Sequence, residues 1–310
     1  MTVASTHPVT IAAAEASELA PALRLVFQYL EAPLHQGRVA NALELIRRGE
    51  FAAEGVRVAR RGEALVGAMI GLPVPGAAAL IWPPQAANPD EQIALEDALL
   101  DATIAWLRQG GTRLAQALLS ARETDLAASL VRHGFQHITR LWYLRHQLRY
   151  STGIRLGHDQ LTYRTYARDT AAPFHETLLR TYEGTLDCPE LNGVRSVDEI
   201  IAGHRNQGLF DPDRWWLALE DETPIGVLLL AEMPDQDSWD LAYLGVVPEA
   251  RGRGLGRRLA CKAIAEARQA DTAELTLSVD ARNRPAWDLY QSLGFEPFDQ
   301  REVYLAIWRE

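Results

Sequence analysis

Lysine is almost absent from this chain of 310 residues, in which Lys262 is the single lysine among 31 basic residues. Acidic residues outnumber the basic ones at 41, and the formal net charge at pH 7 is −10. Proteins that bind nucleic acid or an anionic membrane surface need a positively charged face. The charge balance therefore argues against both classes of partner.

Cysteine is nearly as rare, since Cys188 and Cys261 are the only two. Two cysteines do not make a disulfide framework, so free thiols in a reducing compartment are expected. No apolar run approaches the roughly 20 residues that cross a bilayer. The first residues, MTVASTHPVT, lack the basic and apolar segments of a secretory signal. These absences predict a cytoplasmic protein that does not bind membranes.

The residues that are present suit packed domains, with 47% hydrophobic residues. At about 100–200 residues per domain, the length suggests two of them. An internal repeat gives the same number. The segment SARETDLAASLVRHGF at 120–135 resembles DARNRPAWDLYQSLGF at 280–295, and RVARRGEALVGAMIG at 57–71 resembles WLALEDETPIGVLLLA at 216–231. The two segments of each pair are about 160 residues apart, which indicates a duplication.

Each copy is expected to fold in the same order, with two helices, a hairpin, a strand, a long helix, and then a strand, a short helix and a last strand. The longer predicted helices span 17–30, 39–49, 91–108, 173–183, 196–206 and 255–269. This alternation predicts an α/β fold, with a mixed α+β sheet flanked by helices in two tandem domains. The polar segment at 148–160 marks the boundary, which gives domains 1–150 and 151–310.

The run VVPEARGRGLGRR at 246–258 lies between an apolar strand and a helical segment. Glycine lets the backbone turn sharply and lets a ligand approach its N–H groups. The start of a helix has free N–H groups at the positive end of its dipole, so this junction is suited to a phosphate. The basic residues around the turn are Arg251, Arg253, Arg257 and Arg258. A solvated basic helix start is the alternative interpretation.

Two common phosphate-binding motifs do not fit this run. A P-loop needs a Lys followed by Ser or Thr, and the chain has no such pair. A Rossmann fingerprint reads G-x-G-x-x-G, whereas Gly252, Gly254 and Gly256 are spaced as G-x-G-x-G.

A third pattern does fit. LGVVPEARGRGLG at 244–256 resembles motif A of the GCN5-related N-acetyltransferases, in which Arg/Gln-x-x-Gly-x-Gly/Ala follows a strand. Arg251, Gly254 and Gly256 occupy these positions. VDARNRPAWDLYQSLGF at 279–295 resembles the next motif of the same family. Two motifs in this order and at this separation are specific, and the resemblance covers about 150–310.

This resemblance implies an acetyl-CoA-dependent N-acetyltransferase, with no metal, whose acceptor is the amine of a small molecule. The backbone N–H groups of the turn would hold the diphosphate of coenzyme A. The strand before it would bulge and splay from its neighbour, and pantetheine would lie in the gap. The implied acetyl-CoA-binding residues are Leu244, Gly245, Val246, Arg251, Gly252, Arg253, Gly254, Leu255, Gly256, Arg257, Asn283, Ala286 and Trp287.

Acyl transfer to an amine needs a base for the amine, a donor for the oxyanion and an acid for the leaving thiolate. The resemblance implies that the N–H of Val246 is the donor and that Tyr290, protonated at neutral pH, is the acid. Asp240 stands where several family members have a glutamate base, six residues before Val246. A core tyrosine and a solvated strand-end aspartate are the alternatives for Tyr290 and Asp240.

The first copy lacks this chemistry. Before its long helix the chain reads WPPQAANPDEQIALED at 82–97, where acidic side chains would repel phosphate. Glu123 and Leu130 stand where the second copy has Asn283 and Tyr290. The sequence therefore predicts a degenerate, non-catalytic copy at 1–150 and a catalytic copy at 151–310.

The acceptor would bind near residues 182–213, where seven acidic residues accompany Arg195 and Arg205. The acidic residues are Glu183, Asp187, Glu190, Asp198, Glu199, Asp211 and Asp213. They favour a cationic amine acceptor unless they are simply a solvated acidic surface. A non-catalytic module that senses acyl-CoA or serves as a scaffold is the alternative function.

Overall fold

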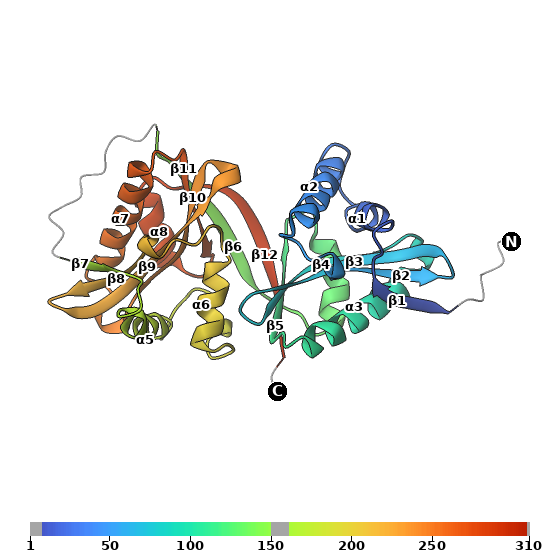
Figure 1. The fold of residues 1–310 in the computed structure, drawn as a ribbon, viewed down its shortest axis with the longest axis horizontal. Coiled ribbons are helices and arrows are strands. Elements are labelled where there is room, and N and C mark those ends of the chain that lie inside the picture. The colour runs from blue at the N-terminus through green and yellow to red at the C-terminus, as the bar shows by residue number, and fades with distance from the viewer. Residues whose placement is uncertain (1–7, 150–160, 309–310) are drawn as a thin grey trace. The chain divides into compact units, whose positions relative to one another are not determined.

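The structure is a computed structural model that describes residues 8–149 and 161–308 (Figure 1). It consists of two compact units. Unit 1 contains the residues up to Ile138 and those from Glu302 onward, and unit 2 contains Thr139–Arg301. No helix within the described ranges is long and apolar enough to cross a membrane.

Unit 1 is a mixed sheet with helices on both faces. Its strands, in spatial order, are β1 (Val9–Ala13), β2 (Val56–Arg61), β3 (Ala64–Val74), β4 (Ala78–Ala86), β5 (Leu114–Leu119) and the end of β12 (Glu296–Ile307). Its helices are α1 (Leu19–Val26), α2 (Leu34–Arg48), α3 (Gln92–Gln109) and α4 (Ala127–Arg132). Two apolar clusters, one under α1 and α2 and the other under α3 and α4, form its core.

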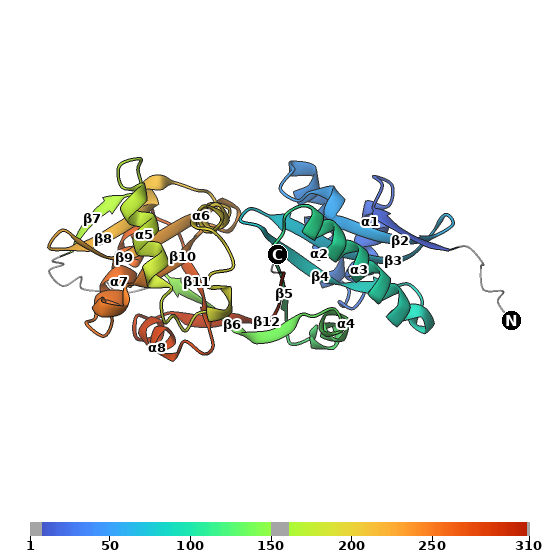
Figure 2. The same cartoon turned by 90° about the horizontal axis from the view of Figure 1, so that it is seen from below.

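Unit 2 repeats this plan. Its strands, in spatial order, are β6 (Gln136–Gln147), β11 (Glu274–Asp280), β10 (Ser238–Val246), β9 (Thr223–Met233), β8 (Trp215–Glu220) and β7 (Thr162–Thr165). Its helices are α5 (Ala171–Thr181), α6 (Val197–Arg205), α7 (Leu255–Gln269) and α8 (Arg284–Ser292). Helices α7 and α8 pack on one face of the sheet and α5 and α6 on the other. Viewed from the side of α5, this helix lies in front of β8 and β9 (Figure 2).

The predicted fold class, a mixed sheet flanked by helices in two copies, is confirmed. All six of the longer predicted helices are present, with bounds that differ by a few residues. Helix α2 begins five residues earlier than predicted because its first turn, LHQGR, lacks apolar periodicity. The prediction missed β1 and β7, which are edge strands of only 5 and 4 residues.

The duplication is visible in the strand pairing. Parallel strands β10 and β11 pair only at Ser238↔Glu274, Trp239↔Leu275 and Asp240↔Thr276. Parallel strands β4 and β5 pair only at Ala78↔Leu114, Ala79↔Ala115 and Leu80↔Gln116. Every residue in the second set lies 160 positions before its counterpart in the first. The two copies therefore keep the same short parallel ladder.

The last strand of each sequence copy pairs with a strand of the other copy. Strand β6 pairs with β11 of unit 2, from Gln147↔Glu274 to Leu141↔Asp280. Residues 302–307 of β12 pair with β5 of unit 1. The compact units therefore do not coincide with the two sequence repeats. The predicted boundary at 148–160 falls almost entirely outside the described residues.

Candidate active site

Strands β10 and β11 part in the middle of unit 2. Their ladder ends at Asp240↔Thr276, but β10 continues to Val246 and β11 to Asp280. On its other side β10 stays paired with β9, with a register shift between Leu241 and Tyr243. A bulge of this kind bends a strand and increases its twist. The predicted splay and bulge are both present, and the bulge lies at Ala242, before the predicted position.

The bulge corrects one prediction about which side chains share a face. Simple alternation places Asp240, Ala242 and Leu244 together and Tyr243 with Trp239 on the opposite face. In the structure Tyr243 packs with Ala242 in the cluster under α5 and α6, whereas Leu244 packs on the side of α7. The extra residue in the strand reverses the alternation after Ala242.

Gly245 is required by a close approach of two elements. A Cβ at this position would lie 2.6 Å from both Cβ and Oγ1 of Thr181 in α5. It would also lie 2.8 Å from Cε1 of Tyr243. Glycine therefore lets α5 pack directly against the end of β10.

The glycine turn before α7 has the backbone that a phosphate site needs. Gly252 and Gly254 have φ angles of +74° and +79°, which favour glycine, and a Cβ on either would meet no atom within 4 Å. Gly254 is the N-cap of α7, which has no side-chain cap and no acidic residue in its first turn. The first N–H groups of a helix have no partner within the helix. They are open to an anion here.

The arginines of this turn already have protein partners. Arg251 donates hydrogen bonds to the carbonyl oxygens of Val246 at 3.0 Å, Thr181 at 2.9 Å and Gly184 at 3.3 Å. It thereby joins the end of β10 to the end of α5. Arg253 pairs with Glu220 at 2.8 Å, and Arg257 donates to Ser292 at 2.7 Å. These side chains supply positive charge, while the free hydrogen-bond donors at the turn are the backbone amides.

The direction of the N–H groups at the end of β10 follows from strand geometry. The N–H of Val247 donates to Ile225 of the hairpin on the β9 side, at 3.0 Å. Successive residues of a strand point their N–H groups to opposite sides. The N–H of Val246 therefore faces the gap between β10 and β11.

Tyr290 lies on α8 and is only 7% exposed. Its ring contacts Phe295 edge to face, at 5.5 Å between centroids. Among the described residues no group forms a hydrogen bond with its hydroxyl. Burial, and then the charge of Asp187, raise the pKa of Tyr290 above its usual value. The phenol is therefore protonated at neutral pH and has a proton to donate.

Asn283 and Trp287 define the start of α8. The Asn283 side chain is the N-cap and accepts a hydrogen bond from the N–H of Ala286 at 3.3 Å. Trp287 is half-buried and packs against Trp142 at 5.3 Å between ring centroids. The motif at 279–295 therefore fixes the helix that carries Tyr290.

Asp240 lies on β10 at the last position of the parallel ladder. The Thr276 hydroxyl donates to its carboxyl at 2.8 Å. Burial raises the pKa of Asp240 to about 6, although the Thr276 hydrogen bond acts in the opposite direction. The group is thus a carboxyl that changes its charge near neutral pH.

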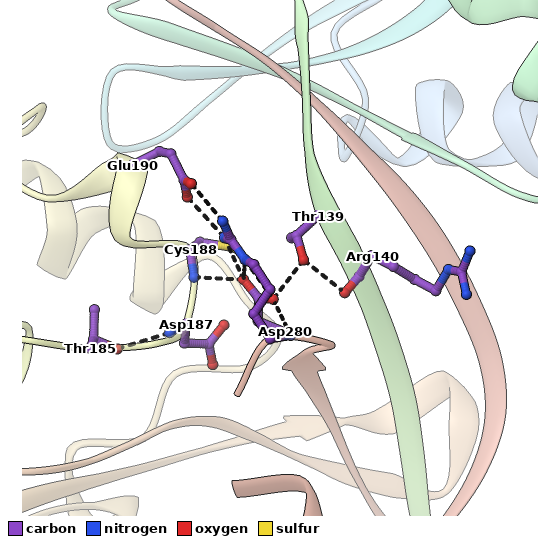
Figure 3. A network of polar contacts seen from close by, with 8 residues as sticks. Thr139, Arg140, Thr185, Asp187, Cys188, Glu190 and Asp280 are labelled. Carbon is purple, nitrogen blue, oxygen red and sulfur yellow. Dashed lines mark hydrogen bonds and ion pairs between the residues drawn. The ribbon is translucent and has the colours of Figure 1, made fainter. Parts of the chain in front are cut away.

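A polar network that the sequence did not predict surrounds Asp280 (Figure 3). This carboxyl is fully buried and accepts hydrogen bonds from the Thr139 hydroxyl at 2.6 Å and the Cys188 N–H at 3.0 Å. Arg282 donates to it through its N–H and its guanidinium, and also pairs with Glu190 at 2.6 Å. The network attaches the loop after α5 to the end of β11.

Asp187, Cys188 and Asp280 offer ligand atoms that lie within 4.8 Å of one another. Arg282 already neutralises Asp280, whose oxygens are occupied by N–H and O–H donors. Nothing in this cluster calls for a metal ion. Burial, then the nearby carboxylates, raise the pKa of the Cys188 thiol, which fits an unreactive loop cysteine.

The Asp280 network predicts a pH-dependent stability. Burial would raise its pKa, but the hydrogen bonds outweigh it and lower the pKa to about 2. The ionised form therefore stabilises the fold above the unfolded pKa of about 3.9, and this contribution is lost as the pH falls toward 2. We expect Asp280→Asn to lower the free energy of unfolding by roughly 2 kcal/mol at pH 7 and by about half as much at pH 3.

Urea denaturation at the two pH values measures this difference. Asp213→Asn is the matched control, because that side chain is exposed. An equal loss of stability for Asp280→Asn at pH 7 and pH 3 would contradict the assignment of the low pKa to Asp280.

Most of the acidic residues at 182–213 have structural partners or lie in solvent. Glu199 forms a capping box with Ser196, and Asp211 caps a short turn. Glu183 and Asp198 are exposed, as expected for a solvated surface. Asp187 is exposed as well, so the predicted preference for a cationic acceptor stays a prediction.

Comparisons with known proteins were consistent with this geometry. The model of the acetyltransferase (GNAT) family matches residues 178–295. A mycothiol acetyltransferase of Beutenbergia cavernae is 31% identical over 214 residues, which is 60% of this chain and 68% of the relative. One of Nocardia farcinica is 30% identical over 231 residues, 67% of this chain and 74% of the relative. The chain belongs to the GCN5-related N-acetyltransferase family.

Solved structures of GNAT proteins share the fold over the whole chain. One from Sphaerobacter thermophilus has a TM-score of 0.64 at 18% identity and covers 98% of both chains. A tandem GNAT protein from the clavulanic acid biosynthesis pathway has a TM-score of 0.52 at 16% identity and covers 97% of this chain and 98% of its own. In its tandem arrangement with a degenerate first copy, the sequence also resembles mycothiol synthase. The mycothiol acetyltransferase relatives and the tandem GNAT neighbour confirm this resemblance.

Unit 1 keeps the short parallel ladder of the GNAT splay, but other residues stand at the place of the glycine turn. Its α3 follows a turn at Pro89–Glu91, where Asn88 caps the chain and Glu91 pairs with Arg61 at 2.9 Å. Glu123, at the position of Asn283, accepts hydrogen bonds from Ser120 and from the Tyr29 hydroxyl. Acidic side chains thus occupy the place of the glycine turn and of the helix cap.

Proposed function

We propose that unit 2 transfers the acetyl group of acetyl-CoA to a primary amine of a small molecule, by direct attack of the amine on the thioester. One observation carries the proposal: the gap between β10 and β11 ends at an uncapped helix start with two left-handed glycines. Such a helix start suits a diphosphate. In the gap, an extended ligand such as pantetheine can pair with the unpaired edge of β10.

We assign the following roles in the reaction to residues of this chain. The amides of the turn bind the diphosphate, and the last part of β10 orients pantetheine. The N–H of Val246, which faces the gap, stabilises the oxyanion. Tyr290 donates its proton to the departing sulfur. Asp240, whose pKa burial raises to about 6, is the candidate for accepting the proton of the amine.

The acceptor class follows from the relatives and from the charge of the loop after α5. The relatives are named as mycothiol acetyltransferases, which supports a small-molecule acceptor. The exposed Asp187 carboxylate favours an ammonium group. Unit 1 has acidic groups where a diphosphate would bind, so we assign it a supporting, non-catalytic role. Acetyl-CoA is a cytoplasmic metabolite, and we place the protein there.

The test combines binding and turnover. Calorimetric titration with acetyl-CoA should show one site per chain. Release of free thiol should then be measured with spermidine, tryptamine, glucosamine and hydroxylamine as acceptors. Thiol release that depends on an amine supports transfer. Tight binding without thiol release for any amine would instead support an acyl-CoA sensor or scaffold.

A further inference from the structure

Three aromatic side chains meet on the face of the unit 2 sheet that α5 and α6 cover. Tyr243 belongs to β10, Tyr182 directly follows α5, and His204 lies near the end of α6. The ring of Tyr243 is 5.3 Å from that of Tyr182, in an edge-to-face arrangement, and 5.4 Å from that of His204. All three residues are partly exposed. We call these three residues the aromatic cluster.

The aromatic cluster lies beside the end of β10 that borders the gap. A Cβ on Gly245 would lie only 2.8 Å from Cε1 of Tyr243, so this ring lies against the strand next to the proposed oxyanion donor Val246. The Tyr243 hydroxyl is 2.8 Å from Oγ1 of Thr181, whose carbonyl accepts a hydrogen bond from Arg251 of the glycine turn at 2.9 Å. The cluster packs on the α5 side of the sheet, whereas the glycine turn leads into α7 on the other side. A thioester that enters the gap from the α7 side can therefore meet an acceptor held on the α5 side.

The hydroxyl protons of the aromatic cluster are already used within the protein. The Thr181 hydroxyl donates to a backbone carbonyl within α5 at 2.6 Å, so its oxygen accepts the proton of the Tyr243 hydroxyl. Burial lowers the pKa of His204 to about 4, so its ring is neutral at pH 7. Its Nδ1 donates to Oε1 of Gln207 at 3.3 Å, and its Nε2 then accepts from the Tyr182 hydroxyl at 3.2 Å. Both tyrosine oxygens therefore offer lone pairs, but no proton, to a ligand.

A group that donates hydrogen bonds and carries a positive charge fits these surroundings. The face of an aromatic ring attracts cations. The same side of the sheet already shows this interaction, because the Arg205 guanidinium lies over Phe210 at 4.7 Å and over Tyr166 at 5.6 Å. In the described part of the chain, no cationic side chain lies over Tyr182 or Tyr243. These two rings are therefore available to an external ammonium group.

Resting on the proposed acetyl transfer, we propose that the aromatic cluster binds the acceptor and selects amines that arrive as ammonium ions. The rings of Tyr182 and Tyr243 stabilise the charge, and their hydroxyl oxygens accept N–H hydrogen bonds. Thr181 and His204 act as positioning residues, because each accepts a hydrogen bond from one of these hydroxyls. The acceptor must still lose a proton before it attacks the thioester. The cluster therefore binds the acceptor and leaves its deprotonation to a separate base.

The experiment compares Tyr182→Leu, which removes the ring, with Tyr182→Phe, which removes only the hydroxyl. With spermidine and tryptamine, both cations at pH 7, Tyr182→Leu should raise KM about 10- to 30-fold. Tyr182→Phe should raise it about 3- to 10-fold. The value of kcat should change little in both variants, since the lost contacts hold the acceptor before and during the reaction alike. The KM of hydroxylamine, which is neutral at pH 7, should also change little.

Tyr163→Leu is the matched control, because this ring packs on the α7 side of the sheet. Its kinetic constants should stay near those of the wild type. Acetyl-CoA affinity, measured by calorimetric titration, shows which variants are folded. If Tyr182→Leu does not fold, Tyr182→Phe and Tyr243→Phe decide the question, because both keep the ring.

A cation that has no N–H group to acetylate tests binding by itself. Tetramethylammonium carries a permanent charge, and tert-butanol is of similar size without it. Tetramethylammonium should inhibit transfer to spermidine competitively, and tert-butanol should inhibit much more weakly. The inhibition constant of tetramethylammonium should rise about 10- to 30-fold in Tyr182→Leu.

Two results would overturn this inference while leaving acetyl transfer intact. One is equal inhibition by tetramethylammonium and tert-butanol. The other is a wild-type KM for spermidine in the Tyr182 and Tyr243 variants, with or without a lower kcat. Acetyl-CoA binding without transfer to any amine by the wild type would overturn the proposed function, and this inference with it.

Discussion

Gly256→Asp should strongly weaken acetyl-CoA binding while leaving the protein folded. Gly256 lies in the first turn of α7 with an ordinary helical backbone, and a Cβ there would be 3.6 Å from Leu289, a normal contact. A carboxylate near a helix N-terminus stabilises the helix by about 0.3–1 kcal/mol. The same carboxylate would repel a diphosphate by several kcal/mol at about 4 Å. The dissociation constant should therefore increase by about 10²- to 10³-fold.

Gly256→Ala is the matched control, because it adds the Cβ without the charge. Calorimetric titration of both variants with acetyl-CoA gives the comparison, and thermal unfolding checks the fold. Wild-type affinity in Gly256→Asp would mean that the diphosphate does not bind at the start of α7. An equal loss in Gly256→Ala would point to steric exclusion and would remove the electrostatic argument.

Tyr290→Phe should lower kcat by about 10²- to 10⁴-fold, the usual contribution of a positioned proton donor. Its effect on folding should be small, because the hydroxyl has no hydrogen-bond partner within the described residues. Acetyl-CoA should bind as tightly as before, since the hydroxyl is proposed to act only on the leaving sulfur. Single-turnover thiol release separates this step from binding.

Tyr166→Phe provides the comparison for Tyr290→Phe. The hydroxyl of Tyr166, which directly follows β7, is hydrogen-bonded to His175 of α5 at 2.9 Å. Its loss should reduce stability by about 0.5–1.5 kcal/mol and leave kcat near that of the wild type. A full kcat in Tyr290→Phe would assign the tyrosine to the core, the alternative that its helical position also allows.

The parts of the site that lie within one continuous segment could be predicted from the sequence. Glycines at 252 and 254, the helix that follows them and the cap at Asn283 depend on local backbone rules. The parting of β10 and β11 was likewise implied by a family motif. These features need no knowledge of distant residues.

The features that were missed depend on contacts between distant residues or on a single extra residue. The bulge at Ala242 is not marked by any glycine or proline there, yet it reverses the faces of Tyr243 and Leu244. Asp280 contacts Cys188, 92 residues away, and Thr139, 141 residues away. The sequence offered one sign, an aspartate at the last position of a strand that alternates polar and apolar residues. It could not show that the end of β11 holds the loop that carries Asp187.

The repeat was visible in the sequence, but the exchange of last strands was not. Residues 120–135 and 280–295 resemble each other because both copies need the same packed helix and turn. Similarity of this kind does not tell which sheet edge the following strand joins. Strands β6 and β12 pair through backbone groups, which every sequence possesses.

A crystal structure of the protein with coenzyme A tests the central claim most directly. The account predicts one molecule per chain, with its diphosphate hydrogen-bonded to the amides of residues 252–257 and its pantetheine arm between β10 and β11. The start of α3 in unit 1 should hold no diphosphate. A diphosphate bound elsewhere, with the turn at 252–257 unoccupied, would contradict the account.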